Sequence, residues 1–413
     1  ATTPVAERVK DVNNAALVER NAIAAEVMQK HQIPVDDLYN LILPDLEKYQ
    51  NPTDCHFNGA GYNLLGAGVA RCILAELQKL GPTRPDKKAA LTTEPDAFSL
   101  VVLPDTQFYS EKFPETYLAQ MRWIKDNVQR ENIRFVIHLG DIVQNPTEEP
   151  EWQNADRAHR ILDGVVPYSV AAGNHDLGLV KKSTVRDAAL FNKYFPPSRF
   201  ANAKWYGGHM GATNENSFCF FDAAGQKFMV LSLEYAPRDE ALDWAAKVLA
   251  AHPQHHAILA THCYMRPTAR DAKCGAGGVG NSGDQVWEKL VRKQPSIFLV
   301  LSGHVLGVGR QTSTNDAGRP VHETLVDYQG LENGGNGWLR VMRFLPRAGK
   351  IEVRAYSPLL DETNPDDAHT FTLDCPMISV PLKGLSQNHR SHAERPSSTE
   401  LPTGSGTGSK KAA

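Results

Sequence analysis

Five short apolar segments in the middle of the chain each end in residues that can bind a metal ion or move a proton. The segments are "FSLVVLPDTQ", "IRFVIHLGD", "YSVAAGNHD", "HHAILATH" and "IFLVLSGH". Their last residues include Asp105 and Gln107, then Asp141, then Asn174, His175 and Asp176, then His262, and finally His304. Each segment is rich in Val, Ile, Leu or Ala, which is typical of a strand buried on both faces. Because sites in layered α/β sheets form beyond the carboxyl ends of strands, we expect these side chains to share one crevice.

The residue types at these ends indicate a metal centre. Oxygen and imidazole donors together suit manganese, iron or zinc. An aspartate can also bridge two ions, and such a pair can activate water and neutralise a phosphate under attack. Taken singly, Asp105 or Asp141 is typical of a turn or a helix cap, and His262 of a hydrogen-bonded core histidine. The order D-x-Q, G-D, G-N-H-D, T-H and G-H, each closing an apolar run, favours the metal centre.

This order resembles that of the calcineurin-like metallophosphoesterases. The matching motifs stand here as "PDTQ", "GDIVQN", "GNHD", "THCY" and "GHVL", and the resemblance covers residues 98–382. It implies an α/β fold, a four-layer α-β-β-α sandwich with two mixed β-sheets. The second sheet would come from the later runs "FCFFDA", "KFMVLSLEY", "VHETLVDYQ", "GWLRVMRFL" and "IEVRAYSP".

The resemblance also implies a role for each strand-end residue. Asp141 would bridge two divalent metal ions. One ion would be completed by Asn174, His262 and His304, and the other would be held by Asp105 and Gln107. His175 would protonate the leaving oxygen or stabilise the charge on the phosphate, and Asp176 would orient its imidazole.

Two positions depart from the family pattern, which has histidine where this chain has Gln107 and Leu306. Both histidines would bind the same ion. An amide is a weaker donor than imidazole for manganese, iron or zinc, and a leucine donates nothing. We therefore expect one tight site and one weak site, the weak one favouring a harder ion.

The reaction that the resemblance implies is hydrolysis of a small phosphate ester by a metal-bound hydroxide, with a histidine as general acid. The chain shows no cationic cluster suited to a doubly charged monoester, which favours phosphodiesters. Two alternatives stay open: a phosphomonoesterase acting on proteins or small molecules, and a non-catalytic binding protein with a degenerate metal site.

Residues 1–82 are expected to form a mostly helical segment, joined by a linker over residues 83–97 to the domain at 98–382, with a disordered tail at 383–413. "NPTDCHFNGAGYNLLGAGVA" resembles the closing segment of SGNH (GDSL) esterases, with Asp54 and His56 in the place of the catalytic acid and base. The first serine of the chain is Ser99, so the nucleophile of such enzymes is missing. Esterase activity of this segment is therefore not expected.

Composition limits the partners and leaves the compartment open. A formal charge of −3 gives no reason to expect nucleic acid or an anionic membrane surface. No apolar run approaches the roughly 20 residues of a membrane helix, and the first residues do not form a signal peptide. The protein would be periplasmic or secreted if a signal peptide was removed, and cytoplasmic otherwise. Cys263 and Cys274 would form a disulfide in an oxidising compartment or stay unpaired. The oligomeric state stays open.

Overall fold

The computed structural model describes residues 4, 14–31, 33–52, 54–79, 94–275 and 278–376. The chain divides into two units, Ala1–Thr93 and Glu94–Ala413, and the division falls inside the segment 83–97. The tail expected from residue 383 onward lies outside the described residues. No helix in the described ranges is both long enough and apolar enough to cross a membrane.

The first unit is helical, as expected. Its elements are α1 (Asn14–Lys30), α2 (Leu38–Ile42), η1 (Leu43–Asp45), α3 (Leu46–Tyr49) and α4 (Gly59–Lys79). Four buried apolar residues from α2, α3, α4 and the loop before α4 form a small core: Ile42, Leu46, Phe57 and Leu65. Asp54 and His56 lie in the loop before α4, with His56 Nδ1 3.3 Å from Asp54 Oδ1 and both side chains largely exposed.

In the second unit, the first sheet has the strand order β13-β12-β11-β1-β2-β3, and β14 pairs with β12. Its strands are β1 (Phe98–Leu103), β2 (Ile133–His138), β3 (Tyr168–Val170), β11 (Leu339–Leu345), β12 (Lys350–Ser357), β13 (Glu362–Asn364) and β14 (Phe371–Asp374). β1, β2 and β3 run parallel to one another, whereas β11 runs antiparallel to β1. The three parallel strands therefore end at one edge of the sheet.

The second sheet has the order β4-β5-β6-β7-β8-β10-β9. Its strands are β4 (Tyr206–His209), β5 (Ser217–Ala223), β6 (Gln226–Leu233), β7 (His256–Thr261), β8 (Ile297–Ser302), β9 (Gly307–Thr314) and β10 (Pro320–Asp327). β6, β7, β8 and β10 are parallel, and the other pairings are antiparallel. Both sheets are thus mixed, as expected.

The expected membership of the second sheet was wrong for two segments. "GWLRVMRFL" and "IEVRAYSP" form β11 and β12, which extend the first sheet beyond β1, with Phe98 opposite Phe344. The reason is that an apolar run predicts a buried strand but not the strands it pairs with. Those partners depend on how the chain crosses between the sheets. Two site-bearing strands, β7 and β8, lie in the second sheet, so the strand ends meet at the junction of both sheets.

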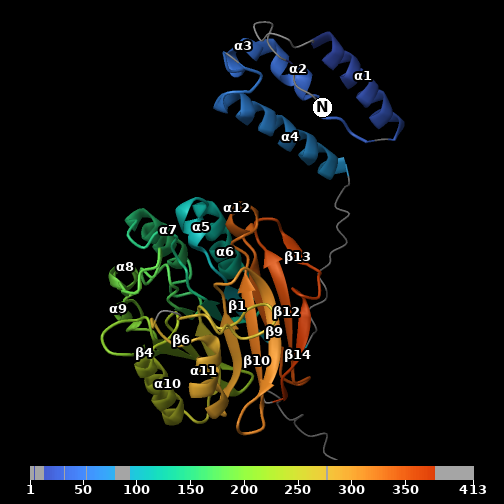
Figure 1. Cartoon of the computed structure of the whole chain (residues 1–413). Helices are drawn as coiled ribbons and strands as arrows, with labels where there is room; N and C mark the ends of the chain where they lie inside the picture. Colours follow the sequence, from blue (N-terminus) through green and yellow to red (C-terminus); the bar gives the residue numbers. More distant parts are fainter. Residues whose placement is uncertain are drawn as a thin grey trace, which may run out of the picture. The chain divides into compact units, whose positions relative to one another are not determined.

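Alternate residues of β1 face two different cores, which places the strand in the middle of a layered fold. Phe98, Leu100 and Val102 face the other sheet, and Val101 and Leu103 face the helices on the outside. Outer helices cover the first sheet: α5 (Gln107–Glu111), α6 (Pro114–Asn127), α7 (Glu149–His159), α8 (Ala189–Tyr194) and α9 (Pro197–Phe200). The second sheet is covered by α10 (Asp239–Ala251) and α11 (Gly283–Lys289). The result is the four-layer α-β-β-α sandwich expected from the sequence (Figure 1).

Candidate metal centre

The carboxyl ends of β1, β2, β7 and β8 bring two carboxylates and two imidazoles together. One donor atom from each of Asp141, His262 and His304 lies within 4.8 Å of the other two. His262 Nε2 is 3.1 Å from Asp141 Oδ2 and 3.8 Å from Asp105 Oδ2. His304 Nδ1 lies 3.2 Å from the same His262 nitrogen. The sequence prediction that these strand ends share one crevice is therefore met for these four residues.

The glycines of the G-N-H-D and G-H motifs make room for the carboxylates. A Cβ on Gly173 would lie 2.1 Å from Asp141 Oδ1, and one on Gly303 would lie 2.2 Å from Asp105 Oδ1. Asp141 and His304 themselves have positive φ angles of 51° and 71°. Left-handed backbone costs a non-glycine residue about 1–3 kcal/mol and tends to occur at functional sites. The local chain is thus shaped to aim these two side chains at a common point.

Hydrogen bonds fix which imidazole nitrogen faces the cluster. His262 Nδ1 is 3.0 Å from the carbonyl oxygen of Leu139, which can only accept, so Nδ1 carries the proton and donates. Nε2 is then directed at the carboxylates. Metal-binding histidines typically donate their other ring N–H to a carbonyl or a carboxylate in this way. The Asp105 carboxylate is held by the backbone N–H of His304, which donates to both of its oxygens, at 3.2 and 3.1 Å.

The buried charges shift one another's pKa strongly. Burial alone would lower the pKa of His262, but the carboxylates of Asp141 and Asp105 outweigh it and raise the pKa to about 10. Burial acts to raise the pKa of Asp141, and the neighbouring His262 lowers it to about 2. Burial raises the pKa of Asp105 well above its usual range. Such a dry cluster of acids and bases is stabilised by a cation among them.

Two amide oxygens at the site are buried without a donor. Within the described part of the chain, no hydrogen-bond donor reaches Gln107 Oε1 or Asn174 Oδ1. The other end of the Gln107 amide is held, because its Nε2 donates to Gln144 Oε1 at 2.7 Å. A buried acceptor left unpaired costs about 1–3 kcal/mol, and a metal ion would satisfy it. The donor set therefore fits a divalent cation, with Gln107 and Asn174 among the ligands predicted from the sequence.

His175 lies beside the cluster and is held by two contacts. Its backbone N–H donates to Asp141 Oδ1 at 2.9 Å, and its Nδ1 donates to the carbonyl oxygen of Gln144 at 2.5 Å. The side chain is partly exposed, so Nε2 is the ring nitrogen left for a substrate.

Asp176 has a different task from the one expected. Its carboxylate accepts backbone N–H groups from Ile142 and Gly173, both at 2.8 Å, and from Val143 at 3.3 Å. The expectation that Asp176 orients the His175 imidazole is therefore corrected: the carbonyl of Gln144 does so. Asp176 instead connects the "GNHD" turn to the "GDIV" turn, because its buried oxygens accept hydrogen bonds from backbone N–H groups of both turns.

Asp327 is a buried acid of this edge that the sequence analysis did not single out. It is the last residue of β10 and is 1% exposed. The run "VHETLVD" is a weaker signal than the other five segments, because only three of the six residues before Asp327 are apolar. From the sequence, this run is expected only as a strand of the second sheet, with no role for its last residue.

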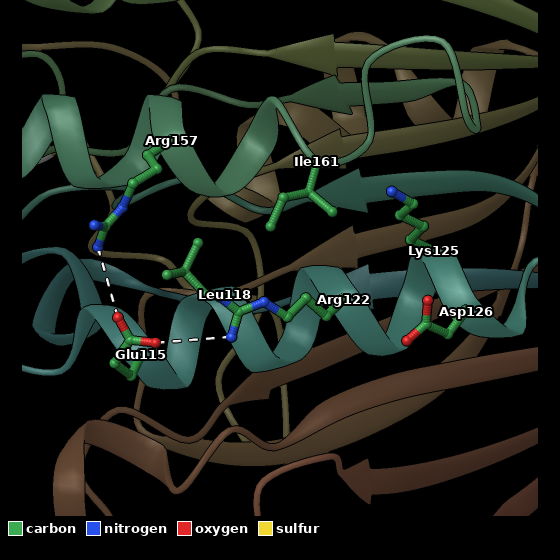
Figure 2. A pocket seen from close by; sticks show the side chains of 7 residues that line it. All are labelled: Glu115, Leu118, Arg122, Lys125, Asp126, Arg157 and Ile161. Carbon is green, nitrogen blue, oxygen red and sulfur yellow. Dashed lines mark ion pairs between the residues drawn. The ribbon is translucent and has the colours of Figure 1, made fainter.

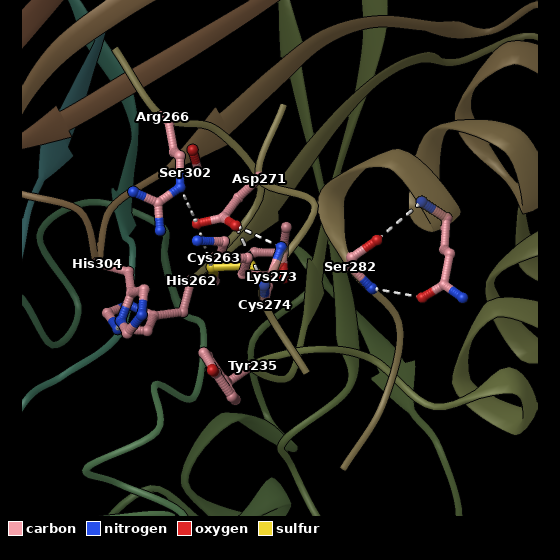
Figure 3. Close-up of a disulfide and its surroundings, with 12 residues drawn as sticks. Tyr235, His262, Cys263, Arg266, Asp271, Lys273, Cys274, Ser282, Ser302 and His304 are labelled. Carbon is pink, nitrogen blue, oxygen red and sulfur yellow. Dashed lines mark hydrogen bonds and ion pairs between the residues drawn. A yellow bond between two sulfur atoms is a disulfide. The ribbon is translucent and has the colours of Figure 1, made fainter. Parts of the chain in front are cut away.

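The loop that follows His262 is closed by a disulfide between Cys263 and Cys274, with a Cα–Cα distance of 6.1 Å. Of the two alternatives left open by the sequence, the structure has the bonded one. Figure 3 shows the disulfide near His262 and His304, with Tyr235 also beside the two imidazoles. The rings of Tyr235 and His304 are 5.3 Å apart. The covalent bridge thus limits how far the chain next to a site histidine can move.

A separate open groove lies on the outer helices, between α6 and the end of α7. Figure 2 shows Glu115 there between Arg122 and Arg157, with ion pairs of 3.7 and 4.0 Å. These side chains are exposed and already paired with one another. The groove lies away from the strand ends, and we assign it no part in the chemistry.

The model of the family described as calcineurin-like phosphoesterase matches residues 98–307, about half of the chain, which includes the ends of β1, β2, β3, β7 and β8. The chain belongs to the calcineurin-like phosphoesterase family. The resemblance of residues 1–82 to SGNH esterases stays a prediction.

The chain is similar to the uncharacterised protein YvnB of Bacillus subtilis (strain 168), with 35% identity over 283 residues. The match covers 67% of this chain but only 21% of that protein, so the chain spans about a fifth of its relative's length. Among solved structures, it is similar to the purple acid phosphatase PPD1 from yellow lupin (Lupinus luteus) seeds, with 12% identity and a TM-score of 0.43 over 70% of this chain and 57% of that one. A putative 5'-nucleotidase from Staphylococcus aureus shows 14% identity and a TM-score of 0.35 over 67% and 54% of the two chains.

Proposed function

We propose that this domain hydrolyses phosphodiesters with the help of two divalent ions placed on either side of Asp141. The supporting observation is the buried cluster itself, in which His262 Nε2 lies 3.1 Å from Asp141 Oδ2, 3.8 Å from Asp105 Oδ2 and 3.2 Å from His304 Nδ1. Asn174, His262 and His304 would hold one ion together with Asp141. Asp105 and Gln107 would hold the other. Bound ions of this kind activate water and neutralise the charge of a phosphate.

His175 would give a proton to the oxygen that leaves phosphorus. Two observations support this role: the carbonyl of Gln144 holds Nδ1, and the backbone N–H donates to the oxygen of a proposed metal ligand. The imidazole is thereby kept next to the ions with Nε2 directed outward. A positioned general acid contributes a factor of roughly 10²–10⁴ in rate.

Two arginines of the loop that follows His262 favour diesters over monoesters. Arg266 pairs with Asp271 at 3.0 Å, and Arg270 pairs with buried Glu323 at 2.6 Å. Both guanidinium groups are therefore neutralised by the protein. A phosphomonoester, which carries a second negative charge, gains little from cations that are already paired. Monoester hydrolysis is the alternative activity that the assay below tests.

The Cys263–Cys274 disulfide supports a location in an oxidising compartment, the periplasm or the cell exterior, because such bonds persist there. A thiol titration of the denatured protein tests this. Four reactive thiols without reductant and six with reductant are expected for protein isolated from its native compartment. Six thiols without reductant would contradict the proposal.

The function is tested by stripping the full chain with a chelator, restoring Mn²⁺, Fe²⁺ or Zn²⁺, and assaying matched aryl phosphate mono-, di- and triesters. We expect activity only after a metal is restored, with kcat/KM highest for the diester. A higher kcat/KM for the monoester would establish the alternative. Metal binding without turnover of any ester would instead favour a binding protein with a degenerate centre.

A further inference from the structure

Gln144 contacts two of the side chains that the proposed reaction uses. Its Oε1 accepts a hydrogen bond from Gln107 Nε2 at 2.7 Å, and its carbonyl oxygen accepts one from His175 Nδ1 at 2.5 Å. With Nε2 engaged, Oε1 is the Gln107 atom left for an ion, and it is buried with no donor in the described ranges. With Nδ1 engaged, Nε2 is the His175 atom left for the leaving oxygen. Gln144 thus orients a proposed metal ligand and the proposed acid.

A carboxylate of α7 in turn holds the backbone of Gln144. Glu151 Oε2 accepts the backbone N–H of Gln144 at 2.8 Å and that of Asn145 at 2.9 Å, and Glu151 Oε1 accepts Asn145 Nδ2 at 2.8 Å. The N–H of Asn145 and the carbonyl of Gln144 belong to one planar peptide group, in which they point in opposite directions. Glu151 on one side and His175 on the other are therefore joined through a single rigid group.

Glu151 makes contacts that the start of a helix does not require. An acid in the first turn of α7 is favourable, and Glu149 is one as well. Glu151 is in addition buried, with 6% of its surface exposed, and a buried carboxylate is costly unless hydrogen bonds replace its water. The three amide donors above do so. The next residue, Trp152, is also buried and donates its Nε1 to the carbonyl of Pro146 at 3.0 Å, so α7 holds the same loop at a second point.

We propose that Glu151 is a positioning residue for the reaction. Through the peptide group between Gln144 and Asn145 it places the imidazole of His175. Through the side chain of Gln144 it also places the amide of Gln107. The inference rests on the proposed function and deepens it, because it makes one buried acid outside the metal centre responsible for the placement of both a ligand and the proton donor.

The kinetic test compares three variants of the full chain with Mn²⁺, below their melting temperatures, on an alkyl and a 4-nitrophenyl phosphodiester. Glu151→Gln should lose roughly 10–100-fold in kcat/KM on the alkyl ester and less on the nitrophenyl ester, since proton donation matters most for a poor leaving group. Gln144→Ala keeps the carbonyl that holds His175, so it should lose equally on both esters and bind one Mn²⁺ roughly 10–100-fold more weakly. The control is Glu148→Gln, an exposed acid at the start of α7 whose side chain caps nothing, and it should match wild type.

The ring nitrogens of His175 report on the same contact without a metal. In nitrogen NMR spectra of the chelator-treated chain at about pH 8, where an ordinary histidine is neutral, wild type should carry the ring proton on Nδ1. Glu151→Gln should share the proton between the two nitrogens. Asn145→Asp, which sets a second carboxylate against Glu151, should have the same effect. The double variant Glu151→Gln/Asn145→Asp restores a donor opposite an acceptor, so its spectrum and its preference between the esters should return toward wild type.

The spectra and the ester preference separate a positioning residue from a structural one. Glu151→Gln and Asn145→Asp with the wild-type ring proton and the wild-type ratio of rates on the two esters would overturn the inference, even if both melt at lower temperatures. Glu151 would then serve the fold alone, and the proposed function would stand. A wild-type chain that hydrolyses neither ester after Mn²⁺, Fe²⁺ or Zn²⁺ is restored would refute the proposed function and the inference together.

Discussion

Replacing His175 by alanine should remove proton donation to the leaving group and little else. The contact between this residue and Asp141 is made by its backbone N–H, which alanine keeps. The lost contact is the hydrogen bond from Nδ1 to the carbonyl of Gln144, and the proposed proton donor Nε2 is removed with it. Metal content should therefore stay at the wild-type value while the general acid disappears.

The size of the loss depends on the leaving group. General acid catalysis is worth roughly 10²–10⁴ in rate, or about 3–5 kcal/mol of activation free energy. His175→Ala should lose this whole factor on an alkyl phosphodiester, whose alkoxide is a poor leaving group. On a 4-nitrophenyl ester, which departs as a stable anion, the loss should be less than about tenfold. The assay is kcat/KM for a series of esters with graded leaving groups.

The control is His255→Ala, a histidine just before β7 and thus at the opposite end of that strand from the site. It should leave kcat/KM unchanged for the whole series. An equal loss for alkyl and nitrophenyl esters in His175→Ala would refute the general-acid role. Loss of metal from His175→Ala would show instead that the residue supports the ions.

Two further predictions concern Asp141, the carboxylate that the two ions would share, and His159, a buried histidine outside the proposed metal centre. Asp141→Asn should lower metal content below one ion per chain and should lower kcat/KM by at least about 10³-fold. The reason is that loss of a single charge-stabilising group alone lowers the rate by roughly 10²–10³. Near-normal turnover with two ions bound would contradict the bridging position of Asp141. Burial, with the nearby His138, holds the pKa of His159 well below its usual value of about 6.5, so the unfolded state binds a proton there that the folded state does not. The domain should therefore lose about 1.4 kcal/mol of stability per pH unit as the pH falls below about 6.5, measured by urea unfolding in chelator, and His159→Gln should lose less per unit. Parallel stability curves for wild type and variant would show that this histidine is not buried in its neutral form.

Local sequence predicted the strands and the residues that meet at their ends, because each proposed ligand follows an apolar run that is long enough to mark a buried strand. The meeting of four strand-end residues could be predicted from the rule that parallel strands end at one edge, without knowledge of distant contacts: Asp105, Asp141, His262 and His304. The glycine of the "GNHD" motif also has a local explanation, because the Asp141 carboxylate occupies the space that a side chain at Gly173 would need.

The features that the sequence did not predict depend on contacts between distant segments. Which sheet β11 and β12 join is decided by strand order, and the bonding of Cys263 to Cys274 by how the loop folds back. The role of Asp176 was misjudged because sequence adjacency to His175 does not show that its oxygens point at the backbone of another turn. The burial of Asp327 at the end of β10 was not predicted, because it depends on the pairing of β10 with β8 and β9.

The central claim is that these strand ends hold two divalent ions that share Asp141. Its most direct test is the anomalous difference density of crystals of the full chain grown with Mn²⁺. We expect two peaks about 3.5–4 Å apart, one on each side of the Asp141 carboxylate, with His262 and His304 on one and Asp105 on the other. A single peak, or peaks away from Asp141, would contradict it.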